Sequence, residues 1–194
     1  MKGIISSNID ESAKLHHNIL KNKRLVESVV FAARKITAAI ESKSKILVAG
    51  NGGSAADAQH FVAELVGRFQ IERNGFPAIA LTTNTSLVTA LANDYSFDRV
   101  FARQVETLAR PGDIFVAITT SGNSNNIISA LESANKIGIE SIGLLGKDGG
   151  KAKNLCTIPI IVPHNSTARI QEIHILLIHS ICDAVEKYFA QKSK

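Results

Sequence analysis

Five short apolar runs, separated by stretches with helical periodicity, constrain the fold of this chain more than any other feature of its sequence. Successive positions within each run are mostly aliphatic, so both faces of a strand would be apolar. That pattern is typical of a parallel sheet covered by helices on both sides. The runs occupy residues 45–50, 77–81, 113–119, 140–146 and 158–162. We therefore expect five buried strands.

Helical patterns fill the intervals between these runs. They cover residues 54–66, 84–92, 97–109 and 125–137, and the last is the clearest amphipathic case, with Gly138 placed as its C-cap. Strand and helix alternate along the chain. The order predicts an α/β fold with an open, mostly parallel five-stranded sheet, right-handed crossovers and flanking helices.

Both ends of the chain are expected to be helical. Residues 10–41 look helical with a break near Asn22, and a long C-terminal helix is expected over 167–190. A length of 194 residues suits one domain without linkers. We expect residues 1–194 to form that single domain, with a helical segment at about 1–43, an α/β core at about 44–163 and the C-terminal helix.

The C-terminal helix carries apolar residues around most of its circumference. A helix of this kind is buried against more than one surface. We therefore expect it to lie in a subunit interface of a homo-oligomer. The residues concerned are Ile173, Ile175, Leu176, Leu177, Ile178 and Ile181.

Charge and composition narrow the classes of partner. The net charge is +5, but the basic residues are spread along the chain, and two Tyr, eight Phe and no Trp give no interleaved basic and aromatic tract. We expect an anionic small molecule and no nucleic acid. The N-terminus lacks a signal-peptide core and no apolar run is long enough for a membrane span, so we expect a cytoplasmic protein with no membrane partner. Cys156 and Cys182 show no metal or redox spacing, which favours two buried thiols.

Two loops after predicted strands have the chemistry to hold an anion. In open α/β sheets ligands bind beyond the carboxyl ends of the strands. Gly50–Ser54 offers glycine backbone and a helix start, and Thr119–Ser124 offers hydroxyls before a second helix start. Either loop alone fits an ordinary turn with a polar N-cap equally well. Neither is a dinucleotide or Walker A motif, so we expect a phosphate site without a nucleotide cofactor.

Further polar residues stand on two predicted helices. His60 and Glu64 share one helix face at a spacing of four, which suits either a solvent-facing pair or two metal ligands. The C-terminal helix presents Gln171, Glu172, His174 and His179 among apolar residues, where each needs a partner once buried. Spacing alone does not choose among these four.

Together these segments resemble the sugar isomerase (SIS) domain, a flavodoxin-like or Rossmann-like fold, and most closely the phosphoheptose isomerases within that family. The resemblance keeps motif order and spacing over nearly the whole chain. It rests on "GNGGSAADAQHFVAELVGRF", "LAND", "TTSGNS", "GKDGGK" and "RIQEIHILLIH".

The resemblance implies a cytoplasmic homotetramer with active sites at subunit interfaces. It implies conversion of D-sedoheptulose 7-phosphate to D-glycero-D-manno-heptose 7-phosphate, which supplies nucleotide-activated heptose for lipopolysaccharide or capsule. Glu64 and His179 match the catalytic pair, base and proton shuttle on an enediol route. One zinc ion per subunit is implied. The matching metal positions are His60, Glu64, Gln171 and His179.

Substrate contacts are also implied by the resemblance. Arg68 is expected one turn beyond Glu64 on the same helix face, where it would orient the carboxylate or contact the sugar. Thr119 replaces the serine that opens this loop in many relatives, and it keeps the hydroxyl. The implied substrate-binding residues are Asn51, Gly52, Gly53, Ser54, Glu64, Arg68, Asn93, Asp94, Thr119, Thr120, Ser121, Ser124 and Gln171.

A non-catalytic alternative shares much of this pattern. SIS-domain proteins include a phosphosugar-binding adaptor that binds the bacterial replication initiator, and phosphosugar-sensing regulators fused to DNA-binding domains. Glu64 and His179 favour the enzyme, because an adaptor has no need of an acid–base pair. The residues before position 45 show no convincing helix-turn-helix, which makes the regulator the weaker reading.

Overall fold

The computed structural model describes residues 1–192 and shows one sheet of five parallel strands. The spatial order is β2-β1-β3-β4-β5, so the chain reverses its direction of travel between β1 and β3. The predicted fold class is confirmed, and the sheet is parallel throughout. The strands are β1 Ile46–Gly50, β2 Ala78–Ala80, β3 Ile114–Thr119, β4 Glu140–Gly146 and β5 Ile158–Val162.

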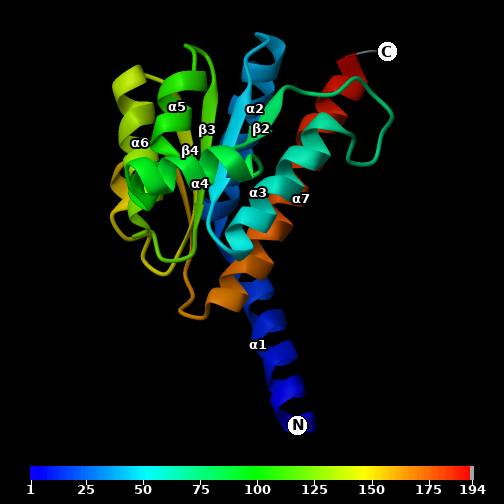
Figure 1. Ribbon diagram of the computed structural model, residues 1–194. Helices are drawn as coiled ribbons and strands as arrows, with labels where there is room; N and C mark the ends of the chain where they lie inside the picture. Colours follow the sequence, from blue (N-terminus) through cyan, green and yellow to red (C-terminus); the bar gives the residue numbers. More distant parts are fainter. Residues whose placement is uncertain (193–194) are drawn as a thin grey trace.

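Helices cover both faces of this sheet. In Figure 1, α4, α5 and α6 lie on one side, whereas α2, α3 and α7 lie on the other, and α1 extends away from the body. The α-helices are α1 Lys2–Lys21, α2 Lys23–Glu41, α3 Gly53–Val66, α4 Thr85–Asp94, α5 Ala102–Leu108, α6 Asn125–Ile137 and α7 Thr167–Lys192. Two short 3₁₀ helices, η1 Phe97–Arg99 and η2 Ala152–Asn154, complete the chain.

Alternate residues of the strands supply two separate cores. Ile46 and Val48 belong to the cluster packed against α2, α3 and α7, while Leu47 and Ala49 belong to the cluster under α5 and α6. All four are fully buried. This explains why the strand segments are apolar at successive positions: both faces of each strand are removed from water.

The helical ends of the chain differ from expectation at their boundaries. The first helix begins at Lys2 rather than near residue 10, and the break at Asn22 is confirmed. Asn22 caps α2 by accepting a hydrogen bond from the backbone N–H of Leu25 at 3.2 Å. The expected helix over 97–109 is divided into η1 and α5. Val100 and Phe101, both buried, lie at the junction between the two.

The apolar circumference of α7 is largely explained within the chain. The helix packs on α2 and α3 as well as on the sheet, and Ile173, Ile178 and Ile181 are at most 1% exposed. Leu176 remains 39% exposed. Apolarity alone therefore does not show that α7 lies in a subunit interface. None of the helices within residues 1–192 is long and apolar enough to cross a lipid bilayer.

His174 joins α7 to the sheet. Its side chain is fully buried, and its Nε2 lies 3.1 Å from the carbonyl oxygen of Leu145 at the end of β4. Burial lowers the pKa of His174 to about 4, although the hydrogen bond to Leu145 opposes the shift. The imidazole is therefore neutral in the folded protein at pH 7.

We expect His174 to make folding sensitive to acid. Between pH 6.5 and 4 the unfolded chain binds a proton at this histidine and the folded chain does not, so stability falls as the pH falls through that window. The loss amounts to about 3 kcal/mol at its largest. The free energy of unfolding in urea should be measured at several pH values across this range. It should depend less steeply on pH for His174→Gln than for the wild type. The exposed His17→Gln variant is the control and should keep the wild-type slope.

Candidate functional site

The two predicted anion loops meet at one cavity. The loops follow β1 and β3, which are neighbours in the sheet, and the cavity opens at the carboxyl ends of these strands. Its volume is about 310 Å³. It is lined by Asn51, Gly52, Gly53, Ser54, Ile118, Thr119, Thr120, Ser124, Thr167 and Gln171.

Two glycines shape the first loop. Gly52 has φ +54° and ψ −121°, a conformation that a residue with a side chain rarely adopts. A Cβ on Gly53 would collide with the side-chain amide of Gln171. The loop therefore needs glycine at the first position for its turn, while a side chain at the second position would displace the amide of Gln171.

Side-chain hydrogen bonds hold the second loop. The Oγ atoms of Thr119 and Ser124 lie 3.1 Å apart, and Ser121 Oγ accepts the N–H of Asn123 at 3.1 Å. Asn51 and Asn126 exchange two amide hydrogen bonds, of 2.8 and 2.9 Å, which connect the first loop to α6. The loops are thus fixed relative to each other before any ligand binds.

Helix starts add a favourable field for an anion. α3 begins at Gly53, α6 at Asn125 and α7 at Thr167, beside the residues that line the cavity. Unpaired N–H groups and the positive end of the helix dipole favour negative charge at such positions. Sequence reasoning missed Thr167 and Asn126. Their positions at predicted helix starts were the signal that could have found them.

A second group of side chains lies farther along α3 and α7. His60 Nε2 is 3.1 Å from Glu64 Oε1 and 3.0 Å from His179 Nε2. One donor atom from each residue lies within 4.8 Å of the others. Two imidazoles and a carboxylate at this separation match the donor set of a catalytic zinc site, which keeps a further position open. The structure therefore brings together three of the four predicted metal positions.

Gln171, the fourth of the predicted metal positions, lies at the cavity. Its amide lies against Gly53, so it faces the first loop. His60 is seven residues beyond Gly53 on α3, and His179 is eight beyond Gln171 on α7. At about 1.5 Å of rise per residue the cavity and the His60–Glu64–His179 group are separated by about 10–12 Å along two helices that run side by side (Figure 1).

The remaining candidates lie elsewhere in the structure. α3 ends at Val66, so the expectation that Arg68 continues the Glu64 face of this helix is wrong. Arg68 Nη1 instead pairs with Glu72 at 3.2 Å. Asn93 and Asp94 are exposed at the end of α4, bonded to each other at 2.9 Å. Glu172 accepts a hydrogen bond from Ser12 Oγ at 2.7 Å, which places it against α1.

Asp57 is a further carboxylate near this group that sequence reasoning did not single out. It precedes His60 by one turn of α3, and its Oδ2 is buried without a hydrogen-bond partner among residues 1–192. Burial raises the pKa of Asp57, and the nearby His60 opposes the shift. No motif in the sequence distinguishes it from an ordinary helical aspartate.

The model of the SIS domain family matches residues 7–146. The phosphoheptose isomerase of Trichlorobacter lovleyi is 49% identical over 187 residues, which is 96% of this chain and 94% of that protein.

Solved structures agree over the same extent. The phosphoheptose isomerase of Neisseria gonorrhoeae superposes with a TM-score of 0.90 at 44% identity, covering 96% of this chain and 98% of the other. The phosphoheptose isomerase of Francisella tularensis also gives 0.90, at 38% identity, covering 95% and 97%. The likeness therefore extends from α1 to α7 and includes both halves of the candidate site.

Proposed function

Because this chain belongs to the SIS domain family and, within it, to the phosphoheptose isomerases, we propose that it interconverts D-sedoheptulose 7-phosphate and D-glycero-D-manno-heptose 7-phosphate. It is a phosphosugar isomerase. The observation that carries the choice of substrate is the separation between the anion cavity and the His60–Glu64–His179 group. A heptose 7-phosphate carries its phosphate at one end and reacts at C1 and C2, at the other.

The phosphate end is proposed to bind in the cavity. Thr119, Thr120 and Ser124 line the cavity and would supply hydroxyls, and the starts of α3, α6 and α7 would supply the field. Ser121, in the same loop but outside the cavity lining, stays a predicted contact by resemblance. Asn51, Gly52, Gly53 and Ser54 would line the sugar phosphate, and Gln171 would contact the sugar between the two halves of the site. Contacts from Arg68, Asn93 and Asp94 stay predictions, because these residues lie away from the cavity in the single chain.

The reacting end is proposed to lie against Glu64 and His179. Glu64 would take the proton from C1 and return it to C2 through a cis-enediol, while His179 would move a proton between O1 and O2. Side-chain exposures of 45% for His60 and 21% for Glu64 leave both accessible to a substrate. Such paired acid–base chemistry needs no nucleotide cofactor.

Zinc is the proposed metal, one ion per subunit. His60, Glu64 and His179 would hold it, with Gln171 as the fourth position by resemblance. When bound, the ion would polarise the substrate carbonyl and stabilise developing negative charge on oxygen.

A homotetramer with active sites at subunit interfaces is also proposed. α1 extends from the body, and its Ile4, Ile5 and Ile9 are 60–67% exposed (Figure 1). An exposed apolar stripe of this kind on a helix is suited to packing against other subunits.

Charge introduced on α1 should break this assembly. The double variant Ile5→Glu, Ile9→Glu replaces side chains that are 60% and 65% exposed in the single chain and would be buried between subunits. Each substitution would remove about 1.5–3 kcal/mol of apolar burial. Light scattering coupled to size exclusion should show a smaller species than the wild type. Asn18→Glu, a charge placed at an exposed polar position of the same helix, should leave the tetramer intact. A double variant of unchanged mass would contradict the proposed interface.

Compartment, pathway and domain organisation complete the proposal. A phosphorylated sugar is charged and does not cross membranes unaided, so the cytoplasm is the proposed compartment. The product would supply nucleotide-activated heptose for lipopolysaccharide or capsule. We also propose that residues 1–194 form one domain, and the contacts of α7 with α2, α3 and the sheet support this.

The test is conversion of sedoheptulose 7-phosphate by the purified protein, followed by NMR. The aldose product should appear, and deuterium from D₂O should enter at the carbon that is reprotonated. Absence of turnover together with binding of the phosphosugar would favour a phosphosugar-binding adaptor over the isomerase.

A further inference from the structure

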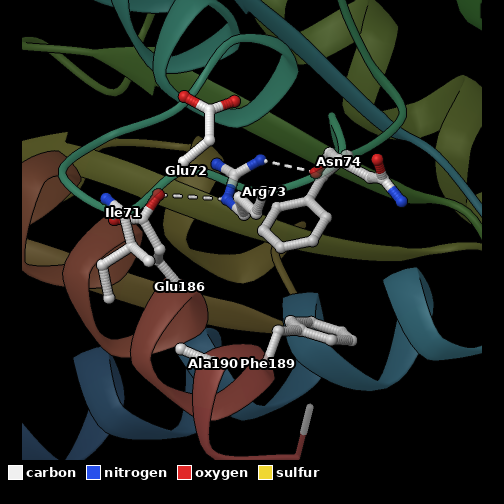
Figure 2. A pocket seen from close by; sticks show the side chains of 8 residues that line it. Ile71, Glu72, Arg73, Asn74, Glu186, Phe189 and Ala190 are labelled. Carbon is white, nitrogen blue, oxygen red and sulfur yellow. Dashed lines mark hydrogen bonds and ion pairs between the residues drawn. The ribbon is translucent and has the colours of Figure 1, made fainter.

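An ion pair outside the candidate site joins the end of α3 to α7. Arg73 Nε donates to Glu186 Oε1 at 3.0 Å, and the two side chains are 11% and 1% exposed. Figure 2 shows the guanidinium between Glu186 of α7 and the backbone of Asn74. The pair borders a cavity of about 680 Å³, but its charged groups already have partners. Its chemistry therefore points to fixing the chain rather than to binding a ligand.

Glu186 holds the segment that follows α3. Its carboxylate accepts the backbone N–H groups of Phe69, Gln70 and Ile71 at 2.9, 2.7 and 2.8 Å. Burial raises the pKa of Glu186, but these hydrogen bonds and Arg73 outweigh that effect and leave the pKa below its usual value. Three backbone donors and one guanidinium together satisfy a charge that would otherwise be costly to bury.

Arg73 holds the last turn of α3 itself. Nη2 donates to the carbonyl oxygen of Glu64 at 2.8 Å, and Nη1 donates to that of Leu65 at 3.0 Å. The ring of Phe76 lies beneath the guanidinium at 3.8 Å. The carbonyl oxygen of Leu65 also accepts the N–H of Phe76 at 2.9 Å. Carbonyl groups at the end of a helix lack intrahelical partners, so the guanidinium of Arg73 serves as a C-cap at the turn that carries Glu64.

We propose that Arg73 and Glu186 are positioning residues for the isomerase site. They connect the backbone of Glu64 on α3 to a point on α7 that lies seven residues beyond His179. They also place Phe69, whose ring centroid is 5.6 Å from that of His179. Two of the three side chains of the His60–Glu64–His179 group come from α3 and the third from α7, so the group forms only where the two helices are held in register. This inference rests on the proposed function for its kinetic consequences but not for its effect on metal binding.

The matched control is Asp113, at the opposite end of the sheet. It is also buried, at 4% exposure. Its carboxylate accepts hydrogen bonds from the backbone N–H groups of Lys45 and Arg110 and from the ammonium group of Lys45. It precedes β3, whereas the candidate site lies beyond the carboxyl ends of the strands. Both substitutions replace a buried carboxylate by an amide. Glu186→Gln does so near the candidate site, and Asp113→Asn does so far from it.

The experiment compares Glu186→Gln with Asp113→Asn by thermal unfolding, by titration of the metal-free proteins with Zn²⁺ alone, and by kcat and KM for sedoheptulose 7-phosphate. Both variants should unfold at a lower temperature. Only Glu186→Gln should lose zinc affinity, by about 10–100-fold, as when residues that orient metal ligands are removed. Its kcat should fall by about 100-fold, as for a small misplacement of catalytic groups, with KM little changed.

Retention of wild-type zinc affinity and kcat by Glu186→Gln would overturn the proposal, and so would equal losses in Asp113→Asn. Should Glu186→Gln not fold, Phe76→Leu leaves both charges and removes the ring that lies beneath the guanidinium and packs on Phe189 at 4.8 Å. It should show the same pattern with smaller losses. Failure of the wild type to isomerise the sugar would refute the proposed function, while the zinc titrations would still decide the role of the ion pair.

Discussion

Replacing Glu64 by glutamine should nearly abolish isomerisation. The change keeps the size of the side chain but removes the group proposed to carry the proton between C1 and C2. General acid–base groups contribute about 10²–10⁴-fold to rates, so kcat should fall by that factor. The phosphate is proposed to bind in a cavity separated from Glu64 by several turns of α3, and KM should therefore change little. Product formation followed by NMR at saturating substrate measures the effect.

The control for this variant is Glu72→Gln. Glu72 belongs to the segment after α3, and its side chain is 82% exposed and paired with Arg68. The control removes the same charge near the site without touching the His60–Glu64–His179 group, so its kcat should equal that of the wild type. A Glu64→Gln enzyme with a kcat within tenfold of the wild type would rule out Glu64 as the base.

Replacing Gly122 by alanine should disrupt the loop Thr119–Ser124, called the phosphate loop below, and destabilise the protein. Gly122 has φ +65°, and a Cβ there would overlap the carbonyl oxygen of Gly149. The carbonyl oxygen of Gly122 accepts the N–H of Ala152 at 2.9 Å. The loop that carries Gly122 and the segment from Gly149 to Ala152 therefore cannot separate without losing a hydrogen bond. The left-handed conformation costs about 1–2 kcal/mol and overpacking about 1–3 kcal/mol more.

Two measurements follow from this clash. A loss of a few kcal/mol should lower Tm by about 6–12 °C in a chain of this size. Displacement of Thr119 and Ser124 should raise KM for the phosphosugar by at least about tenfold, since charge-assisted hydrogen bonds contribute about 1.5–3 kcal/mol each.

Gly138→Ala separates conformational strain from the clash. Gly138 caps α6 with φ +81°, but a Cβ there meets no other atom within 4 Å. Its replacement should cost only the conformational penalty, about 1–2 kcal/mol, and leave KM unchanged. Equal effects of the two substitutions on Tm and KM would show that the contact between the phosphate loop and Gly149 is unimportant.

The local pattern of residues was enough to predict the secondary structure of this chain. The predicted strands agree with the observed ones to within one residue at either end, and α6 runs from Asn125 to Ile137 as predicted. Parallel strands buried on both faces require continuous apolar runs, and a glycine in the left-handed conformation ends a helix. The prediction of a single helix over 97–109 was wrong, because the chain divides at Val100 and Phe101 into η1 and α5.

The sequence also predicted where an anion would bind. Gly50–Ser54 and Thr119–Ser124 each follow a strand and precede a helix, and the carboxyl ends of neighbouring parallel strands meet at one edge of the sheet. Thr167 and Asn126 join the site through contacts between elements that are distant along the chain. Their positions at predicted helix starts were a signal for them, but one that residues outside any site share.

Only the tertiary structure decided which polar residues of α7 face α3. A helix with apolar residues nearly all round has no single apolar stripe, so the sequence does not fix its rotation about its axis. Packing against α2, α3 and the sheet sets that rotation: it turns His179 toward His60, buries His174 against β4 and places Glu172 beside Ser12. The Arg73–Glu186 pair joins residues more than 100 positions apart, and its partners become neighbours only when α7 lies alongside α3.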